Sequence, residues 1–94
     1  MSAYLIAHIA VKDPQAWQVY VDTVGSTLAP FEAAVVFRGK RAAVLTGEHP
    51  YDTVAVLKFP DTAAIESWYH SEAYQALIPT RTQAADVVFI SYNT

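Results

Sequence analysis

A chain of 94 residues has the length of one small domain, and such a chain buries only about 60–65% of the surface that its unfolded form exposes. Hydrophobic residues make up 53% of it and charged residues only 16%, against roughly 25% charged in typical soluble domains. We therefore expect a single domain, residues 1–94, that covers its excess apolar surface by forming a homodimer. The net charge of −3 argues against a nucleic-acid partner.

Two features that the sequence lacks exclude further classes of function. The chain contains no cysteine, which excludes disulfides, thiolate nucleophiles and Cys-ligated metal sites. No apolar run approaches the roughly 20 residues of a membrane span, and the first residues lack the basic and small-residue pattern of a signal peptide. We expect a soluble, cytoplasmic protein without a membrane partner.

The first third of the chain predicts a strand followed by a helix. Residues 3–11 carry apolar side chains at both odd and even positions, which predicts a central strand buried on both faces. Asp13 followed by Pro14 is a strong helix start, because Asp accepts from free backbone N–H groups and Pro needs no partner for its nitrogen. Pro30 closes the helix. Its apolar face is predicted to consist of Trp17, Tyr20, Val21, Val24 and Leu28.

The middle of the chain predicts two more strands. The first covers Ala33 to Phe37 and is followed by a bend at Gly39-Lys40. Residues 42–46 are either a continuation of this strand or the returning arm of a hairpin, and the sequence leaves both open. Turn chemistry makes residues 47–52 a loop. The β-branched, nearly continuous apolar run from Thr53 to Phe59 predicts another buried strand.

The last third predicts broken helical structure and a final strand. Asp61 is expected to cap a helix that ends at a break at His70-Ser71, since Ser71 is itself a good N-cap. A short helix then runs through Leu77, and Pro79 starts one more helical turn. The last strand is predicted from Asp86 to Tyr92. The helix after Asp61 presents one face formed by Ala64, Ile65, Trp68 and Tyr69.

The element order βαββαβ predicts a ferredoxin-like α+β fold. Helical crossovers and a short middle connection give a four-stranded antiparallel sheet with both helices on one face. Such a sheet leaves its second face uncovered, and here that face is apolar as well. Two copies packed through these faces would form a dimeric α/β barrel.

The tract from Trp68 to Arg81 carries a family resemblance. The run Trp68-Tyr69-His70-Ser71 and the run Tyr74-Gln75-Ala76-Leu77-Ile78-Pro79-Thr80-Arg81 resemble the family of unknown function numbered 1330. Further matching positions are Asp13-Pro14, Tyr20, Arg38-Gly39 and Phe59-Pro60, so the resemblance covers essentially the whole chain.

The resemblance implies the dimeric α/β-barrel superfamily. Other branches of that superfamily include cofactor-free monooxygenases acting on polyketides, muconolactone-isomerase-like enzymes, and haem-binding peroxidases and chlorite dismutases. The family itself has no established reaction. This chain departs from the family pattern at Lys40, where a second glycine is common, and at His70, where a small polar residue such as Asn is frequent.

Barrels of this type place a ligand cleft between the sheet and the helices, so the resemblance implies a site near the Trp68–Arg81 tract. The rings of Trp68, Tyr69 and Tyr74 are predicted to form its walls, although plain core packing would produce the same spacing. Arg38 or Arg81 is predicted to clamp a carboxylate, enolate or phenolate. The alternative for Arg81 is a structural salt bridge. Its acidic candidates are Glu66, Glu72 and Asp86.

Two histidines are candidate general bases, because imidazole exchanges a proton near neutral pH. His70 lies at the bend of the tract, where the alternative is an exposed residue at a helix end. His8 lies in the first strand, where the alternative is a buried, hydrogen-bonded core residue. No His or Glu spacing pre-arranges a metal site, so neither a metal nor a cofactor is predicted.

Three functions therefore compete. The first is a cofactor-independent oxygenase or isomerase acting on a small apolar or aromatic metabolite with an acidic oxygen. The second is a non-catalytic module that binds such a metabolite. The third is a structural dimer without a ligand.

Overall fold

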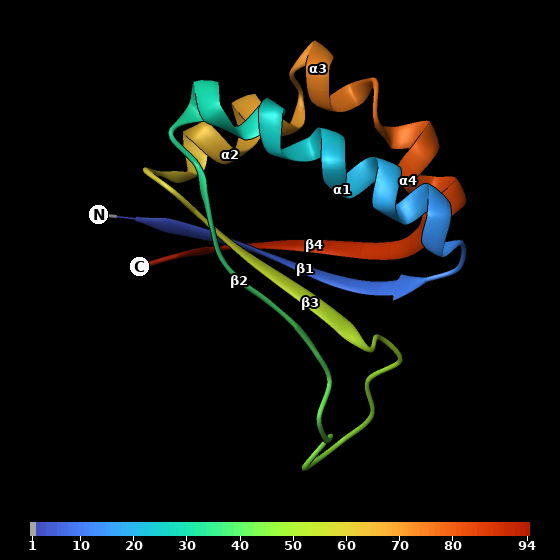
Figure 1. Cartoon of the computed structure of the whole chain (residues 1–94). Coiled ribbons are helices and arrows are strands. Elements are labelled where there is room, and N and C mark those ends of the chain that lie inside the picture. Colours follow the sequence, from blue (N-terminus) through green and yellow to red (C-terminus); the bar gives the residue numbers. More distant parts are fainter. Residues whose placement is uncertain (1) are drawn as a thin grey trace.

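A computed structural model describes residues 2–94 (Figure 1). The chain forms, in order, β1 (Ala3–Val11), α1 (Pro14–Leu28), the 3-10 turn η1 (Ala29–Phe31), β2 (Ala34–Lys40), β3 (Thr53–Phe59), α2 (Thr62–Tyr69), α3 (Glu72–Gln75), α4 (Ile78–Ala84) and β4 (Ala85–Asn93).

The four strands form one antiparallel sheet in the order β2-β3-β1-β4. Figure 1 shows the helices together on one side of this sheet and both chain ends at the same edge of the molecule. The predicted α+β, ferredoxin-like fold is confirmed. No helix within residues 2–94 is both long and apolar enough to cross a membrane.

The helices begin where polar capping residues were expected. The Asp13 carboxylate accepts from the backbone N–H groups of Gln15 and Ala16 at 3.1 and 3.2 Å, and Pro14 is the first helical residue. Asp61 accepts from the N–H of Ala64 at 2.8 Å. These bonds satisfy donors that a helix N-terminus leaves without a partner.

The two faces of β1 are covered differently. Residues at odd positions from Ala3 to Ile9 are buried beneath the helices, whereas those at even positions from Tyr4 to Ala10 are only half-buried. Within one copy of the chain, the prediction of burial on both faces therefore holds for the helix side alone. The largest fully buried side chains are Trp68, Tyr74 and Phe59.

The face of the sheet that points away from the helices is apolar and uncovered. Strand pairing places Ile6 of β1 beside Val56 of β3 and Ile90 of β4 on this face. Phe37, Val88, Ile90 and Tyr92 are large hydrophobic residues of this sheet that remain exposed.

Residues 42–46 follow neither alternative that the sequence left open, whereas residues 47–52 form the predicted loop. β2 continues through the expected bend to Lys40, with a register shift between Val35 and Phe37, and the chain then forms an irregular loop. Lys40 pairs with Thr53, the first residue of β3. Residues after Lys40 thus have no neighbouring strand to pair with, although their apolar side chains are compatible with a strand.

Candidate functional site

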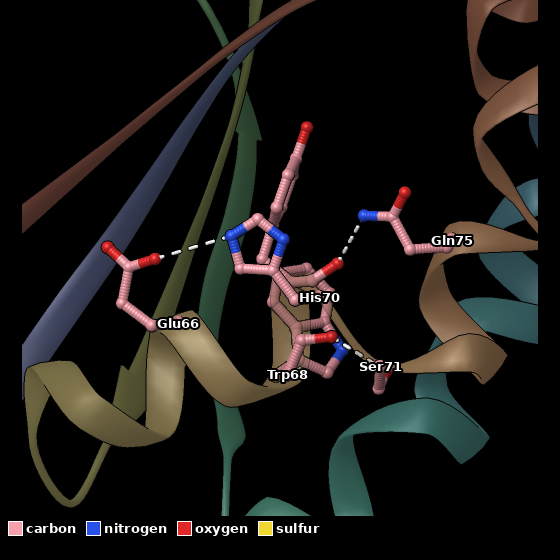
Figure 2. Close-up of polar contacts among 6 residues, drawn as sticks. Glu66, Trp68, His70, Ser71 and Gln75 are labelled. Carbon is pink, nitrogen blue, oxygen red and sulfur yellow. Dashed lines mark hydrogen bonds and ion pairs between the residues drawn. The ribbon is translucent and has the colours of Figure 1, made fainter.

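The Trp68–Arg81 tract folds as three short helical pieces, α2, α3 and α4. The break expected at His70-Ser71 is present: the Ser71 hydroxyl accepts from the N–H of Tyr74 at 3.2 Å and donates to the Trp68 carbonyl at 2.7 Å. Figure 2 shows this turn, with Gln75 also donating from its side chain to the backbone carbonyl of Tyr69 at 2.6 Å. These polar contacts hold the bend in one shape.

The bend places two large rings of the tract in the core. Trp68 is 1% and Tyr74 is 0% exposed, and their ring centroids lie 4.2 Å apart. The Trp68 indole N–H donates to the Thr27 hydroxyl of α1 at 2.9 Å. Core packing therefore accounts for these two rings, whereas Tyr69 is only half-buried.

A chain of hydrogen bonds leads from the core to Arg81. The hydroxyls of Tyr20 and Tyr74 lie 2.8 Å apart, and the Arg81 Nη1 donates to the Tyr74 hydroxyl at 2.9 Å. Tyr20 comes from α1, Tyr74 from α3 and Arg81 from α4. Helix α1 is thus joined to the distant pair α3 and α4 through two phenols and one guanidinium.

These groups keep their ordinary charge states at neutral pH. Burial raises the pKa of Tyr20, and the adjacent Tyr74 raises it further. Burial also raises the pKa of Tyr74, against the opposing effect of the hydrogen bonds from Tyr20 and Arg81. Burial alone would lower the pKa of Arg81, but its contacts with Tyr74 and Tyr69 outweigh this and the pKa is raised. Two neutral phenols therefore face a guanidinium that stays charged.

Arg81 has no acidic partner within residues 2–94. The ion pairs of this part of the chain are Lys12–Asp86 and His70–Glu66, so the structural salt bridge considered for Arg81 is not formed. Its guanidinium carbon lies 5.4 Å from the ring centre of Phe89 and 6.0 Å from that of Tyr74. The positive charge is held among aromatic rings without being neutralised.

Arg81 lines an open groove of about 360 Å³ between α2 and β4. The groove is bordered by Leu5, Ile65, Glu66, Trp68, Tyr69, His70, Arg81, Val87, Phe89 and Ser91. Three of the predicted site residues, Tyr69, His70 and Arg81, thus meet at one place, with Trp68 behind them. Tyr74 reaches it only through its hydrogen bond to Arg81.

His70 lies at this groove as an exposed side chain. It is 69% exposed, and its Nε2 lies 3.6 Å from the Glu66 carboxylate one helical turn earlier (Figure 2). A carboxylate at this position can orient the imidazole ring.

The cavity between the sheet and α1 is much smaller. This cavity measures about 50 Å³ and shares Trp68 and Phe89 with the groove, whereas a cavity that accepts benzene needs about 150 Å³. Arg38 lies at this cavity and not at the groove. The structure therefore does not bring Arg38 and Arg81 together.

His8 lies on the opposite side of the sheet. It belongs to the even positions of β1, which face away from the helices, and its ring lies 5.0 Å from that of His49. The two candidate bases are thus separated by the sheet. Within residues 2–94, no group of three His, Asp or Glu side chains is placed to hold a metal ion.

Two of the groove residues that were not predicted as site residues are Phe89 and Glu66, the second of which was considered only as an acidic partner for Arg81. Phe89 pairs with Ala7 and therefore shares the helix-facing side of the sheet, a position that strand alternation alone would indicate. Glu66 precedes His70 by four residues, the spacing at which helical side chains meet.

The fold and groove define a ferredoxin-like α+β protein with an arginine that has no acidic partner in the described residues, beside an aromatic-walled groove. The chain belongs to the family described as "Domain of unknown function (DUF1330)", which matches residues 2–92. A search of curated proteins found no match.

Several solved structures share the fold. The protein of unknown function RPA0582 from Rhodopseudomonas palustris is 17% identical, with a TM-score of 0.84 over 99% of this chain and 82% of that one. SnoaB, a cofactor-independent oxygenase from Streptomyces nogalater, is 7% identical, with a TM-score of 0.72 over 99% of this chain and 92% of that one. A dimeric ferredoxin-like protein of unknown function from Jannaschia sp. CCS1 is 12% identical, with a TM-score of 0.70 over all of both chains. At these identities the likeness shows the fold alone.

Proposed function

We propose that this chain forms a homodimeric α/β barrel whose groove between α2 and β4 binds a small apolar or aromatic metabolite carrying an anionic oxygen. The observation that carries the proposal is Arg81, a charged guanidinium with no carboxylate partner in residues 2–94 that lines the groove. A carboxylate, enolate or phenolate would supply the missing counter-charge.

The groove has the size and walls that such a ligand needs. Its volume of about 360 Å³ falls at the low end of the usual range for small-molecule sites, about 300–1,000 Å³. The rings of Tyr69 and Phe89, whose centroids lie 6.2 Å apart at an interplanar angle of 89°, provide an apolar corner. The cavity beside Trp68, at about 50 Å³, is too small for an aromatic ring.

His70 is the proposed general base for a cofactor-independent oxygenase or isomerase reaction. It borders the same groove as Arg81, and Glu66 lies within 3.6 Å to orient its ring. In this scheme His70 removes a proton from the metabolite while Arg81 stabilises the resulting oxyanion. His8 is left out of the proposed site because it lies across the sheet.

The exposure of His70 favours a second candidate, a non-catalytic binding module. The imidazole is 69% exposed, whereas catalytic groups more often lie in clefts that shield them from water. The same groove and the same arginine would then hold a metabolite without turnover. A structural dimer without a ligand remains as the third candidate if the groove binds nothing.

Binding of simple aromatic carboxylates tests the site. Titrating benzoate and 2-naphthoate into ¹⁵N-labelled protein should shift the amide signals of Tyr69, Arg81 and Phe89. We expect Arg81→Met to weaken this binding by about tenfold or more, whereas Arg38→Met, which removes a guanidinium at the other cavity, should leave it unchanged. Equal affinity in wild type and Arg81→Met would contradict the proposed anion clamp, and no binding of any such compound would support the structural dimer.

A second measurement separates enzyme from binding module. Proton exchange at the acidic carbon of a bound cyclic ketone, followed by NMR in heavy water, reports deprotonation directly. His70→Asn should abolish this exchange while carboxylate binding persists. Exchange that is undetectable in the wild type, or unaffected by the substitution, would favour the non-catalytic module.

The proposed homodimer rests on the uncovered sheet face. A face with Ile6, Val56 and Ile90 side by side and with Phe37 52% exposed is typical of an interface. The likeness to a protein described as dimeric supports the same assembly. Light scattering that finds a monomer at micromolar concentration would contradict the dimer.

A further inference from the structure

The loop of residues 41–52 is an arm with a braced base. The N–H of Arg41 donates to the Asp52 carbonyl at 2.7 Å, which closes the base. The Arg41 guanidinium donates through Nη1 to the carbonyl of His49 at 2.8 Å and makes a longer contact to that of Tyr51 at 3.4 Å. These bonds tie the two limbs together, so the loop leaves the sheet in a defined direction.

The arm extends toward the uncovered side of the sheet. Figure 1 shows the green and yellow-green segment between β2 and β3 reaching away from the helix layer. Ring contacts agree with the picture: His8, on the helix-free face of β1, lies 5.0 Å from His49, and His49 lies 5.5 Å from Tyr51. The returning limb is thus held against the helix-free face.

The outer part of the arm is apolar and exposed. Leu45 is 94% exposed and Val44 is 41% exposed, although both lie in a segment whose base is well ordered by hydrogen bonds. Gly47 adopts a φ of 83°, a conformation that favours glycine and turns the chain back toward the sheet. The Leu45 side chain, almost fully exposed beside this turn, therefore buries almost no apolar surface within its own copy of the chain.

The length of the arm matches the spacing of packed sheets. Leu45 is four residues from the base at Arg41, so it extends at most roughly 14 Å from it. Sheets stacked face to face lie about 10 Å apart. A second copy that docks on the uncovered face therefore comes within reach of the arm.

We propose that the 41–52 arm clasps the second copy of the chain and seats Leu45 against the partner. This inference rests on the proposed homodimer and adds a contact that the flat sheet face alone does not provide. By two-fold symmetry each copy gives one arm and receives one, so a single substitution alters two equivalent contacts.

Sedimentation equilibrium of Leu45→Ser tests the clasp. Loss of a buried leucine is expected to weaken association about tenfold per contact, and therefore about 100-fold for the two contacts of a dimer. The matched control is Val19→Ser, which removes a side chain that is 59% exposed on α1, in the layer on the other side of the sheet. Circular dichroism of both variants checks that the fold is kept.

Cross-linking adds a direct reading of the contact, because the chain has no cysteine of its own. A photoreactive benzophenone attached to Leu45→Cys should cross-link the two copies, whereas the same probe on Val19→Cys should not. A wild-type monomer would overturn the proposed homodimer, and the clasp with it. A wild-type dimer whose affinity is unchanged in Leu45→Ser, with no cross-link from position 45, would overturn the clasp and leave the homodimer standing.

Discussion

Replacing Tyr74 with Phe should destabilise the protein more than replacing Tyr20 with Phe, although the two hydroxyls share one hydrogen bond. The Tyr74 hydroxyl contacts both Tyr20, at 2.8 Å, and Arg81, at 2.9 Å. Both substitutions keep the ring and its packing. They differ in which polar groups they leave without a partner.

The magnitudes follow from burial. Tyr20→Phe removes one hydrogen bond but leaves Tyr74 bonded to Arg81, so the expected loss is about 1 kcal/mol. Tyr74→Phe leaves the Tyr20 hydroxyl, in a side chain only 4% exposed, without its partner, which alone costs about 1–3 kcal/mol. It also removes the bond from Arg81, which water in the open groove replaces in part. We expect a total of about 3 kcal/mol for Tyr74→Phe.

Urea unfolding at several protein concentrations measures both losses and separates them from any contribution of self-association. In a domain of this size each 1 kcal/mol lowers the melting temperature by about 4–8 °C, so the two variants should be readily resolved. The double variant should cost less than the two single losses added, because it leaves no orphaned hydroxyl. Equal losses in the two single variants, or strict additivity in the double variant, would refute this reasoning.

Three further outcomes are expected from the same region. The pKa values of buried Tyr20 and Tyr74 lie above the ordinary 10.0, so the unfolded chain loses these protons at a lower pH than the folded chain. The free energy of unfolding should therefore be constant below about pH 10 with respect to these groups, and fall above it by up to about 1.4 kcal/mol per pH unit for each tyrosine. Urea midpoints between neutral and alkaline pH should show this slope, and Tyr20→Phe should flatten it. Ser71→Ala removes the cap of α3 and should cost about 1 kcal/mol, seen as a lower urea midpoint, whereas Glu72→Gln, at an exposed neighbouring position, should change it little. Trp68→Phe removes the 2.9 Å bond to Thr27 and some ring area, so the free energy of unfolding should fall by at least about 1 kcal/mol. A smaller loss in thermal unfolding would show that this bond contributes little.

Local chemistry made much of the fold predictable from the sequence. Asp13-Pro14, Asp61 and Ser71 mark helix starts because their side chains satisfy backbone donors nearby, and this interaction involves only neighbouring residues. The run from Thr53 to Phe59 is β3 at the expected bounds. Turn chemistry also predicted the loop at residues 47–52. Residues 42–46 could not be predicted in the same way, because whether an apolar segment becomes a strand depends on a pairing partner, and β3 begins too late to provide one.

The sequence predicted which residues form the candidate site better than it predicted how they are arranged. The Trp68–Arg81 tract indicated Tyr69, His70 and Arg81, which do meet at the groove. It did not indicate that Tyr20, 54 residues before Tyr74, would form a hydrogen bond with the Tyr74 hydroxyl, since that contact depends on how α1 crosses α3. Nor did it separate Arg38 from Arg81, because the distance between two cavities follows from the sheet order and not from local pattern.

In its surroundings, Arg81 contributes little to the stability of the fold alone. Partial burial of the guanidinium opposes its charge, and no carboxylate within residues 2–94 offsets that effect. What it gains is one hydrogen bond to a neutral phenol and contacts with two rings, each worth about 0.5–2 kcal/mol. A methionine of similar length would pack against the same rings without desolvating a charge. Under the proposed function, an anion in the groove would supply the counter-charge that no carboxylate within residues 2–94 provides.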